Sequence, residues 1–322
     1  MRELRFVHAI NEALREEMRR DRLVFVMGED VRLSPFGATV NLVEEFGEER
    51  VLNTPISENS MAGAAVGAAA AGMRPVVDFQ TASFAFLAFD QLANQAGMLR
   101  YLSGGQVKLP IVYRLLFGAR GSAAAQHSHS PHSMMMNIPG LKIIIPSTPH
   151  DAKGLLKSAI RDDNPVMFFE HMSLGKEIGP VPEDDYLVPI GQAKVVREGS
   201  DATIVATGTL VKKSLKVAED YALYGISLEV IDPRTLVPLD KKTILESVAK
   251  TGRLVVADEG HLTCGFASEL AAMVAEEGFS SLKAPIRRVA TLDVPIPFSP
   301  PMEKYVLPDE TKISKAIEGI LE

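Results

Sequence analysis

The sequence predicts an α/β fold made of two domains, each with a parallel sheet covered by helices. Short runs rich in Val, Ile and Leu alternate with segments of helical periodicity, which is typical of parallel sheets with helices on both faces. The chain has 322 residues, more than one ordinary core accommodates, and a Pro-rich, acidic segment at 175–189 interrupts the alternation. We therefore expect a first domain at 1–178, a linker at 179–190 and a second domain at 191–322.

The first domain is expected to alternate strands and helices along its length. Apolar, β-branched runs predict strands at 23–27, 50–53, 75–79, 111–115, 142–145 and 166–170. Helical spacing of apolar residues predicts helices at 6–18, 39–46, 59–72, 84–101 and 150–161. Active sites of such sheets lie beyond the carboxyl ends of the strands, which places Glu29, Glu58 and the loop after Leu115 at one edge.

The second domain shows the same alternation without an internal repeat. Strands are predicted at 202–206, 227–231, 254–257 and 287–290. Helices are predicted at 210–224, 241–250, 267–276 and 310–321. Two doubly wound sheets in sequence are therefore expected.

Composition excludes several classes of protein. A net charge of −7 without any run of Lys or Arg argues against a nucleic-acid partner. No segment reaches the roughly 20 apolar residues that cross a membrane, and the acidic, helical beginning does not resemble a signal peptide. One cysteine excludes disulfides within the chain and indicates a reducing compartment, so we expect a cytoplasmic protein.

Glu58 is the most informative residue of the chain. It follows the turn Thr54-Pro-Ile-Ser57 and is the only ionisable side chain from Ser57 to Met73. Apolar surroundings favour the neutral form of a carboxyl group, which suits it to give and take a proton. The alternative is an ordinary acid in the first turn of a helix, where the helix dipole favours negative charge.

The helix that Glu58 begins is rich in Gly and Ala. Its apolar run ends at Arg74-Pro75 and is too short for a membrane dimer, so it indicates close packing, at a subunit interface in our interpretation. Gly63 and Gly67 lie within the helix, whereas the glycines of a dinucleotide fingerprint lie in the turn that opens one.

Three histidines at 127, 129 and 132 form the second group of candidate residues. Their spacing in a Ser/Pro loop matches no recognised zinc motif, and no cysteine or carboxylate nearby completes one. Histidines on a loop above a sheet edge suit proton transfer or stabilisation of an anion near neutral pH. The chain has no nucleophile elbow or Walker loop, and Cys264 is expected to be a small core residue.

Several motifs together resemble one family over almost the whole chain, the beta subunits of the thiamine-diphosphate-dependent 2-oxo acid dehydrogenases. This family includes the pyruvate, branched-chain and acetoin dehydrogenases. The motifs are Thr54–Gly72, Phe84, Asp90-Gln-Leu-Ala-Asn-Gln-Ala96, Gln126-His-Ser128, Ile138-Pro-Gly-Leu-Lys142, Asp151-Ala-Lys-Gly-Leu-Leu156 and Arg161-Asp-Asp-Asn-Pro165. They occur in the family's order and without large gaps. The resemblance implies a pyrimidine-binding, transketolase-like domain followed by a transketolase C-terminal-like domain.

The resemblance also implies roles for four residues. Glu58 matches the glutamate that bonds the pyrimidine ring of thiamine diphosphate and relays a proton, and Phe84 matches the ring stacked on that pyrimidine. Glu29 resembles an acid beside the same ring. His127 matches the histidine that stabilises the carbanion after decarboxylation and protonates the lipoyl sulfur during acyl transfer.

Two further sites are implied by the resemblance. Ile111, Ala159, Asp162 and Asn164 hold the positions of a potassium site built mainly from backbone carbonyls. Asp293 holds the place of an acid that meets the binding domain of the lipoyl acyltransferase core, although an ordinary aspartate turn at a strand end explains it equally well.

A Gly-Asp-Gly motif with paired asparagines, which binds Mg²⁺ and diphosphate in relatives, is missing. The resemblance therefore implies that a separate alpha subunit holds the metal, in an α2β2 assembly that is active only when complete. The expected reaction is oxidative decarboxylation of a 2-oxo acid, by an oxidoreductase within a multienzyme complex. A transketolase-like ketol transferase and a non-catalytic scaffold subunit are the alternatives.

The sequence departs from the family after His127. Relatives read His-Ser-Gln-Ser there, whereas this chain has His129 and then His132 before the three methionines 134–136. These changes leave pyruvate, a branched-chain 2-oxo acid and an acetoin-type substrate all open.

Overall fold

The computed structural model describes residues 1–322, which divide into two units. In the first unit, apolar, β-branched runs form a parallel sheet. Unit 1 comprises residues 1–117 and 134–190, and unit 2 comprises residues 118–133 and 191–322. Within unit 1 the strands run in the order β6-β7-β5-β4-β2-β3, all parallel. Their bounds are β2 (Val24–Gly28), β3 (Val51–Asn53), β4 (Arg74–Thr81), β5 (Val112–Phe117), β6 (Lys142–Ile144) and β7 (Val166–His171).

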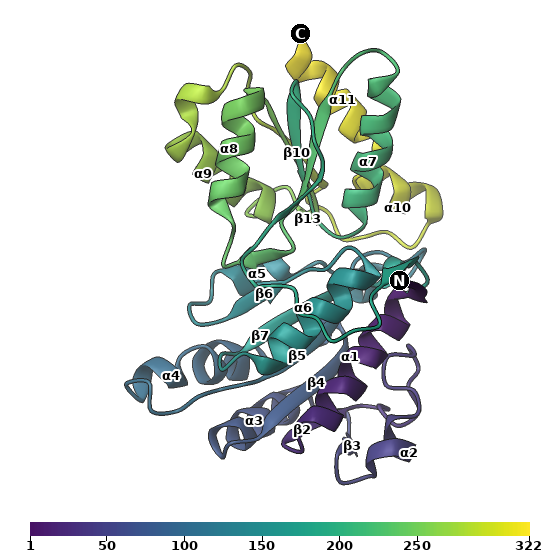
Figure 1. The fold of residues 1–322 in the computed structure, drawn as a ribbon, viewed down its shortest axis with the longest axis vertical. Helices are drawn as coiled ribbons and strands as arrows, with labels where there is room; N and C mark the ends of the chain where they lie inside the picture. Colours follow the sequence, from purple (N-terminus) through teal and green to yellow (C-terminus); the bar gives the residue numbers. More distant parts are fainter. The chain divides into compact units, whose positions relative to one another are not determined.

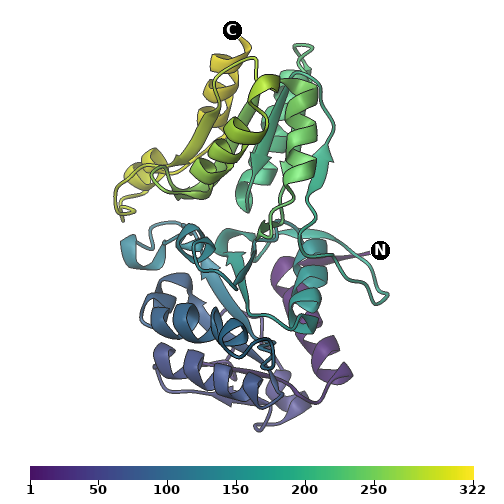
Figure 2. The same cartoon turned by 90° about the vertical axis from the view of Figure 1, so that its left-hand side faces the viewer.

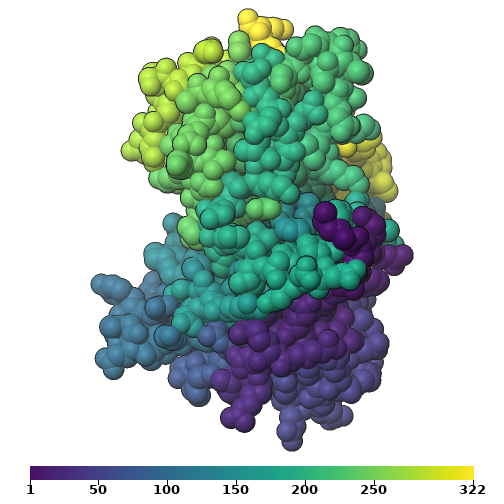
Figure 3. Space-filling model, in the orientation of Figure 1, coloured from purple at the N-terminus to yellow at the C-terminus, as the bar shows by residue number.

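Helices cover both faces of this sheet. On one face α1 (Phe6–Arg20) packs against α6 (Pro149–Arg161), as Figures 1 and 2 show, and in Figure 3 the purple atoms of α1 lie beside the teal atoms of α6. Residues four apart on α1, from Phe6 to Met18, enter the core between helix and sheet. The other face carries α3 (Glu58–Ala70), which contacts β4. The short helix α2 (Leu42–Phe46) precedes β3.

Two fully buried lysines join α1 to α6. Lys153 bonds Glu12 and Glu16, and Lys157 bonds Glu16 and Asp185. Burial alone would raise the pKa of Glu16, but hydrogen bonds from both lysines outweigh it and lower the pKa. The apolar pattern of the sequence did not predict this network, because both lysines lie on the buried face of α6, where the pattern predicts apolar residues.

The helix expected at 84–101 is wrong as a single element. The structure has a 3-10 turn η1 (Ala82–Phe86), a π-helical turn η2 (Gln91–Ala96) and the short helix α4 (Leu99–Leu102). The interruption has a packing cause, because the backbone at Gly97 lies directly against Gly140, whose φ is +92°. A Cβ on Gly140 would lie 1.9 Å from the Gly97 carbonyl oxygen.

The segment expected to be a linker carries regular structure. Strand β8 (Ile178–Val181) pairs antiparallel with β1 (Arg2–Arg5), beginning after the 3-10 turn η4 (Met172–Leu174). Further along, Val188 joins the core of unit 1. The helix α6 begins where expected, since the Thr148 side chain accepts a hydrogen bond from the Asp151 backbone N–H and Pro149 follows it.

Unit 2 is a second doubly wound sheet in the order β14-β13-β10-β11-β9, in which only β9 is antiparallel. Its strands are β9 (Lys194–Arg197), β10 (Ala202–Ala206), β11 (Leu228–Asp232), β13 (Leu254–His261) and β14 (Arg287–Thr291). The short strand β12 (Thr235–Val237) also lies in unit 2 but is not part of this sheet. Its helices are α7 (Thr209–Ala222), α8 (Lys241–Thr251), α9 (Phe266–Glu277), α10 (Pro300–Val306) and α11 (Glu310–Leu321), with 3-10 turns η3 (Ala125–His127) and η5 (Phe279–Ser281). Helix α5 (His132–Met136) spans the boundary between the units.

Within unit 2, α7 and α11 lie on one side of the sheet and α8 and α9 on the other (Figure 1). The predicted strands and helices of this unit are confirmed, with shifts of a few residues at their ends; β9, β12 and α10 were not predicted. No helix of the protein has both the length and the apolar character needed to cross a membrane.

The close approach of Gly140 to Gly97 predicts that Gly140→Ala lowers the free energy of unfolding by about 3 kcal/mol, because the new Cβ overlaps backbone and the φ is left-handed. Gly67→Ala is the matched control, since nothing lies within 4 Å of its Cβ position in α3. It should raise stability by about 0.5–1 kcal/mol through helix propensity. Urea unfolding of the chain alone measures both; equal effects would contradict the packing argument.

Candidate active site

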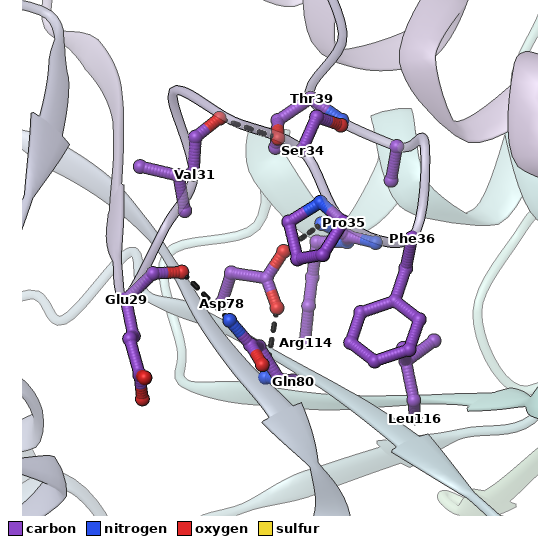
Figure 4. A pocket seen from close by; sticks show the side chains of 11 residues that line it. Glu29, Val31, Ser34, Pro35, Phe36, Thr39, Asp78, Gln80, Arg114 and Leu116 are labelled. Atoms are coloured by element: carbon purple, nitrogen blue, oxygen red, sulfur yellow. Dashed lines mark hydrogen bonds and ion pairs between the residues drawn. The ribbon is translucent and has the colours of Figure 1, made fainter. Parts of the chain in front are cut away.

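Glu29 lies directly after β2, where this strand and β4 approach each other closely. A Cβ at Gly28 would lie 2.5 Å from the Asp78 carbonyl oxygen, so only glycine permits this approach. The Gln80 side-chain amide donates to the Glu29 carbonyl oxygen at 2.9 Å (Figure 4). The figure also shows the Glu29 carboxylate pointing away from Asp78 and Arg114.

Glu58 is the first residue of α3, and its side chain is 6% exposed. The turn before it is tied to β2, because the Thr54 backbone N–H donates to the Gly28 carbonyl oxygen at 3.0 Å. Burial, followed by the charges of Asp30 and Glu58, raises the pKa of Glu29. The two carboxylates predicted from the sequence therefore act on each other in unit 1.

Phe84 lies in η1, which follows β4 and contacts α3. Its ring is half-buried, whereas Phe86 and Phe89 are exposed. Of these three phenylalanines, Phe84 is therefore the least exposed. Glu29, Glu58 and Phe84 all belong to the same unit.

An ionic cluster joins the neighbouring strands β4, β5 and β7, and the sequence reasoning missed it. Arg114 on β5 donates from Nε to Glu170 on β7 at 2.7 Å and from Nη1 to Asp78 on β4 at 2.8 Å. The Arg114 side chain is 2% exposed. A signal was present in the sequence, since each of these charges interrupts an apolar strand that predicts complete burial.

The cluster holds more negative than positive charge. Burial, with Asp78 adding to it, raises the pKa of Glu170 despite the opposing effect of Arg114. Burial lowers the pKa of Arg114, but the two carboxylates outweigh it and raise the pKa overall. Arg114 therefore stays charged, whereas burial favours the neutral form of Glu170.

Gln80 connects this cluster to Glu29. Its φ is +57°, a conformation that is strained for any residue except glycine. The Asp78 carboxylate accepts a hydrogen bond from the Gln80 backbone N–H at 2.8 Å and so holds the strained turn. The order of support thus runs from Arg114 to Asp78, then Gln80, then the Glu29 backbone (Figure 4).

His127 lies in unit 2, at the end of η3. It is half-buried and follows Ala124, whose φ of +61° is also left-handed. His129, two residues later, has a pKa lowered by burial and then by the charge of His261. Proton-transfer groups on a strained, structured loop are typical of functional sites.

His132 is fully buried, whereas His127 is half-buried. Its Nε2 lies 3.0 Å from Oδ2 of Asp258, which is also fully buried. Oδ1 of Asp258 accepts from the Thr207 hydroxyl at 2.5 Å. No group of three or more His, Cys, Asp or Glu side chains in the structure is arranged to hold a metal ion.

The expectation that Cys264 is a core residue is wrong. Cys264 is exposed and has a φ of +56°, because it lies in the turn between β13 and α9. Asp293 is exposed as well, and it accepts hydrogen bonds from the Thr263 backbone and hydroxyl at 3.0 and 2.6 Å, which lower its pKa. Its docking role stays a prediction, and the turn explains its position.

The potassium positions Ile111, Ala159, Asp162 and Asn164 all lie in unit 1, and the Asn164 amide donates to the Asp162 carboxylate at one corner of it. The Ile111 carbonyl accepts from Val166 N–H at 2.8 Å, and the Ala159 carbonyl accepts from Asp162 N–H at 3.2 Å. Cationic side chains occupy this corner: Arg74 donates to the Asp162 carbonyl, Arg100 to the Asn164 side chain and Lys142 to the Asp162 carboxylate. A potassium ion would compete with them, and the site stays a prediction from the resemblance.

The cluster predicts losses of stability of different size for two substitutions. Arg114→Met leaves the buried Glu170 and the partly buried Asp78 without a counter-charge and should lower the free energy of unfolding by about 3–5 kcal/mol. Glu170→Gln should cost only about 1 kcal/mol, because burial already favours the neutral acid.

The pH dependence supplies a second check on Glu170. With its folded pKa raised, the folded state holds a proton to higher pH than the unfolded chain, whose ordinary value is 4.5. The contribution of Glu170 to stability is therefore greatest below 4.5 and declines as the pH rises through the folded value. Urea unfolding from pH 4 to 8 should show this decline in the native chain but not in Glu170→Gln; an unchanged slope would contradict it.

Comparison with known proteins supports both units. Residues 2–177 match the family "Transketolase, pyrimidine binding domain", and residues 191–313 match "Transketolase, C-terminal domain". A solved structure titled "Split gene transketolase, inactive beta4 tetramer" is similar with a TM-score of 0.81, covering 98% of this chain and 97% of that one. Its 24% sequence identity supports the fold alone.

Curated relatives are similar over nearly their whole length. The 2-oxoisovalerate dehydrogenase subunit beta of Bacillus subtilis is 45% identical, covering 98% of both chains. The acetoin:2,6-dichlorophenolindophenol oxidoreductase subunit beta of the same organism is 44% identical, covering 95% of this chain and 93% of the relative. The pyruvate dehydrogenase E1 component subunit beta of Rickettsia felis is 46% identical, covering 97% and 96%. With the two transketolase-type domains, these similarities show that the chain belongs to the beta subunits of the thiamine-diphosphate-dependent 2-oxo acid dehydrogenases.

Proposed function

We propose that this chain supplies the proton-transfer residues Glu58 and His127 to a 2-oxo acid dehydrogenase that transfers an acyl group to a lipoyl arm. The observation that carries the proposal is the buried Glu58 at the start of α3, whose charge contributes to the raised pKa of Glu29. Two interacting carboxylates in a partly apolar site suit proton transfer near neutral pH.

The residues present fit the pyrimidine half of thiamine diphosphate. A buried carboxyl group at Glu58 can bond a ring nitrogen, and the half-buried ring of Phe84 offers a stacking surface. Glu29, with its raised pKa, offers a second hydrogen-bonding group. The cofactor, when bound, supplies the carbon nucleophile that attacks the carbonyl carbon of a 2-oxo acid.

In this proposal Glu58 holds and moves one proton through its carboxylate oxygens, at the pyrimidine nitrogen. Glu29 keeps its place through the Gln80 amide and the buried Arg114 cluster. His127 donates a proton to the lipoyl sulfur that leaves when the acyl group is transferred. Imidazole is the side chain that most often acts as a general acid or base in proteins.

A partner must complete the site. The chain lacks the Gly-Asp-Gly and paired-Asn motif, so Mg²⁺ and the diphosphate would be held by an alpha subunit in an α2β2 assembly. The relatives are all named as beta subunits. We also propose that the complex contains a lipoyl acyltransferase core, that the chain binds a potassium ion, and that the protein is cytoplasmic.

The names of the relatives favour this function over a ketol transferase or a scaffold, because all three are dehydrogenases or oxidoreductases. They do not select a substrate, since near-equal identity links the chain to enzymes named for 2-oxoisovalerate, acetoin and pyruvate. One methylene changes discrimination by only about 1–3 kcal/mol, so the substrate is decided by assay.

Glu58→Gln should lower kcat at least about 100-fold, because the amide keeps the shape but carries no proton to transfer. The assay is dye reduction dependent on pyruvate, 2-oxoisovalerate or acetoin, with thiamine diphosphate and Mg²⁺, on the chain alone and co-expressed with the alpha subunit. The native chain should be active only in the co-expressed sample. Glu48→Gln, on an exposed acid, is the control and should keep full activity. Turnover by the chain alone would overturn the split site.

His127→Ala should separate two steps that Glu58→Gln does not. Transfer of the acyl group to a lipoylated domain should fall at least about 100-fold, because the departing sulfur loses its proton donor. Dye reduction, which needs no lipoyl sulfur, should fall much less. Equal losses in both assays would assign His127 to substrate activation instead.

A further inference from the structure

The segment 118–133, which carries His127, is held by unit 2, although the strand before it belongs to unit 1. Two carboxylates of unit 2 bind its backbone. The Ala119 N–H donates to Glu259 at 2.6 Å, and the Ser122 N–H donates to Glu303 at 2.7 Å. The Ser133 hydroxyl accepts from the Phe266 N–H at 2.9 Å, at the start of α9.

The end of this segment fills the place where open α/β sheets bind ligands. That place lies beyond the carboxyl ends of the strands, where the strand order reverses. In unit 2 the order reverses between β10 and β13; Thr207 follows β10, and Asp258 lies in β13 directly after Ala257, the last residue paired with β10. The His132 side chain meets them there, with its Nε2 3.0 Å from the Asp258 carboxylate.

The fit around this pair is close. The Asp258 carboxylate also accepts from the Thr207 hydroxyl at 2.5 Å and from the Gly260 N–H at 3.0 Å. A Cβ at Gly260 would lie 2.6 Å from Oδ2 of Asp258 and 3.3 Å from Nε2 of His132. Glycine is therefore required at 260 for the pair to form.

We infer that the His132–Asp258 pair is an anchor that occupies the ligand crevice of unit 2 and positions His127 for acyl transfer. The inference rests on the proposed function for the role of His127. His132 and Asp258 are positioning residues, because they act through the four connecting residues 128–131 to His127. Glu259 and Glu303 hold the other end of the segment, so both sides of His127 are fixed to unit 2.

The connection is short and constrained, which makes the anchor effective. Pro131 stands next to His132, and Ser128, next to His127, is 2% exposed. A displacement of His132 therefore moves the backbone at His127. Misplacing a catalytic group by about 1 Å can reduce a rate about 100-fold.

The His132–Asp258 pair is shielded from solvent. Both side chains have at most 1% of their surface exposed. Burial alone would raise the pKa of Asp258, but His132, Thr207 and Gly260 outweigh it and lower the pKa. The carboxylate stays charged at neutral pH and needs its partner.

The test compares four variants of the assembled alpha–beta complex: His132→Ala, Asp258→Asn, Glu303→Ala and the exchange His132→Asp with Asp258→His. Glu229→Gln is the matched control, because it breaks the pair with Lys250 elsewhere in unit 2. Glu303→Ala leaves the His132–Asp258 pair intact and serves if the pair variants fail to fold.

The first readout is trypsin cleavage after Arg120, which is exposed within the segment. We expect about tenfold faster cleavage in His132→Ala, a smaller increase in Asp258→Asn, which keeps a hydrogen bond, and none in Glu229→Gln. Unchanged cleavage in every anchor variant overturns the inference.

The second readout separates positioning from stability. Acyl transfer to a lipoylated domain should fall about 100-fold in His132→Ala while dye reduction changes less than about threefold. The exchange variant should recover part of the transfer. Equal losses in both assays, or losses matched by Glu229→Gln, would show a merely structural pair. If no substrate supports turnover, the proposed function fails, and cleavage at Arg120 still decides whether the anchor exists.

Discussion

The first unit depends on one buried guanidinium group. Arg114 joins three neighbouring strands, since its partners Asp78 and Glu170 stand on β4 and β7, on either side of β5. A parallel sheet has no side-chain requirement of its own at this depth, and burying a charge there is costly without full pairing. The bonds from Arg114 to both carboxylates offset part of this cost and fix the geometry of the side chains around it. Gln80 and Glu29 inherit that geometry through two successive hydrogen bonds.

The second unit applies similar chemistry to another purpose. Its carboxylates bind backbone N–H groups and one histidine of the segment that carries His127. In both units a carboxylate that accepts from a backbone N–H helps to hold the backbone near a candidate catalytic residue. Rigid elements thus place the reactive groups, as is typical of sites built on sheets.

Periodicity and residue chemistry predicted most of the sheet. The runs at β2, β5, β7, β10 and β13 are apolar enough to be unambiguous, and the isolation of Glu58 in a Gly/Ala helix marks it as a candidate by residue chemistry alone. Periodicity failed where tertiary contacts decide: the contact of Gly97 with Gly140 breaks a helix, and β1 finds its partner β8 far along the chain. The Arg114 cluster could have been suspected from charges within apolar strands. The His132–Asp258 pair joins residues 126 positions apart, and a local pattern holds no information about such a pair.

The division of the chain between the units has a consequence for the gene. Because residues 118–133 lie in the middle of unit 1 in sequence but belong to unit 2, the chain passes between the units three times. A gene fragment encoding 191–322 would therefore produce unit 2 without its segment 118–133. The remaining fragment would carry this segment without the residues of unit 2 that bind it. The two units match separate domain families, yet in this protein they are not exchangeable parts. Recombination that swaps one of them has to carry a short internal stretch of the other.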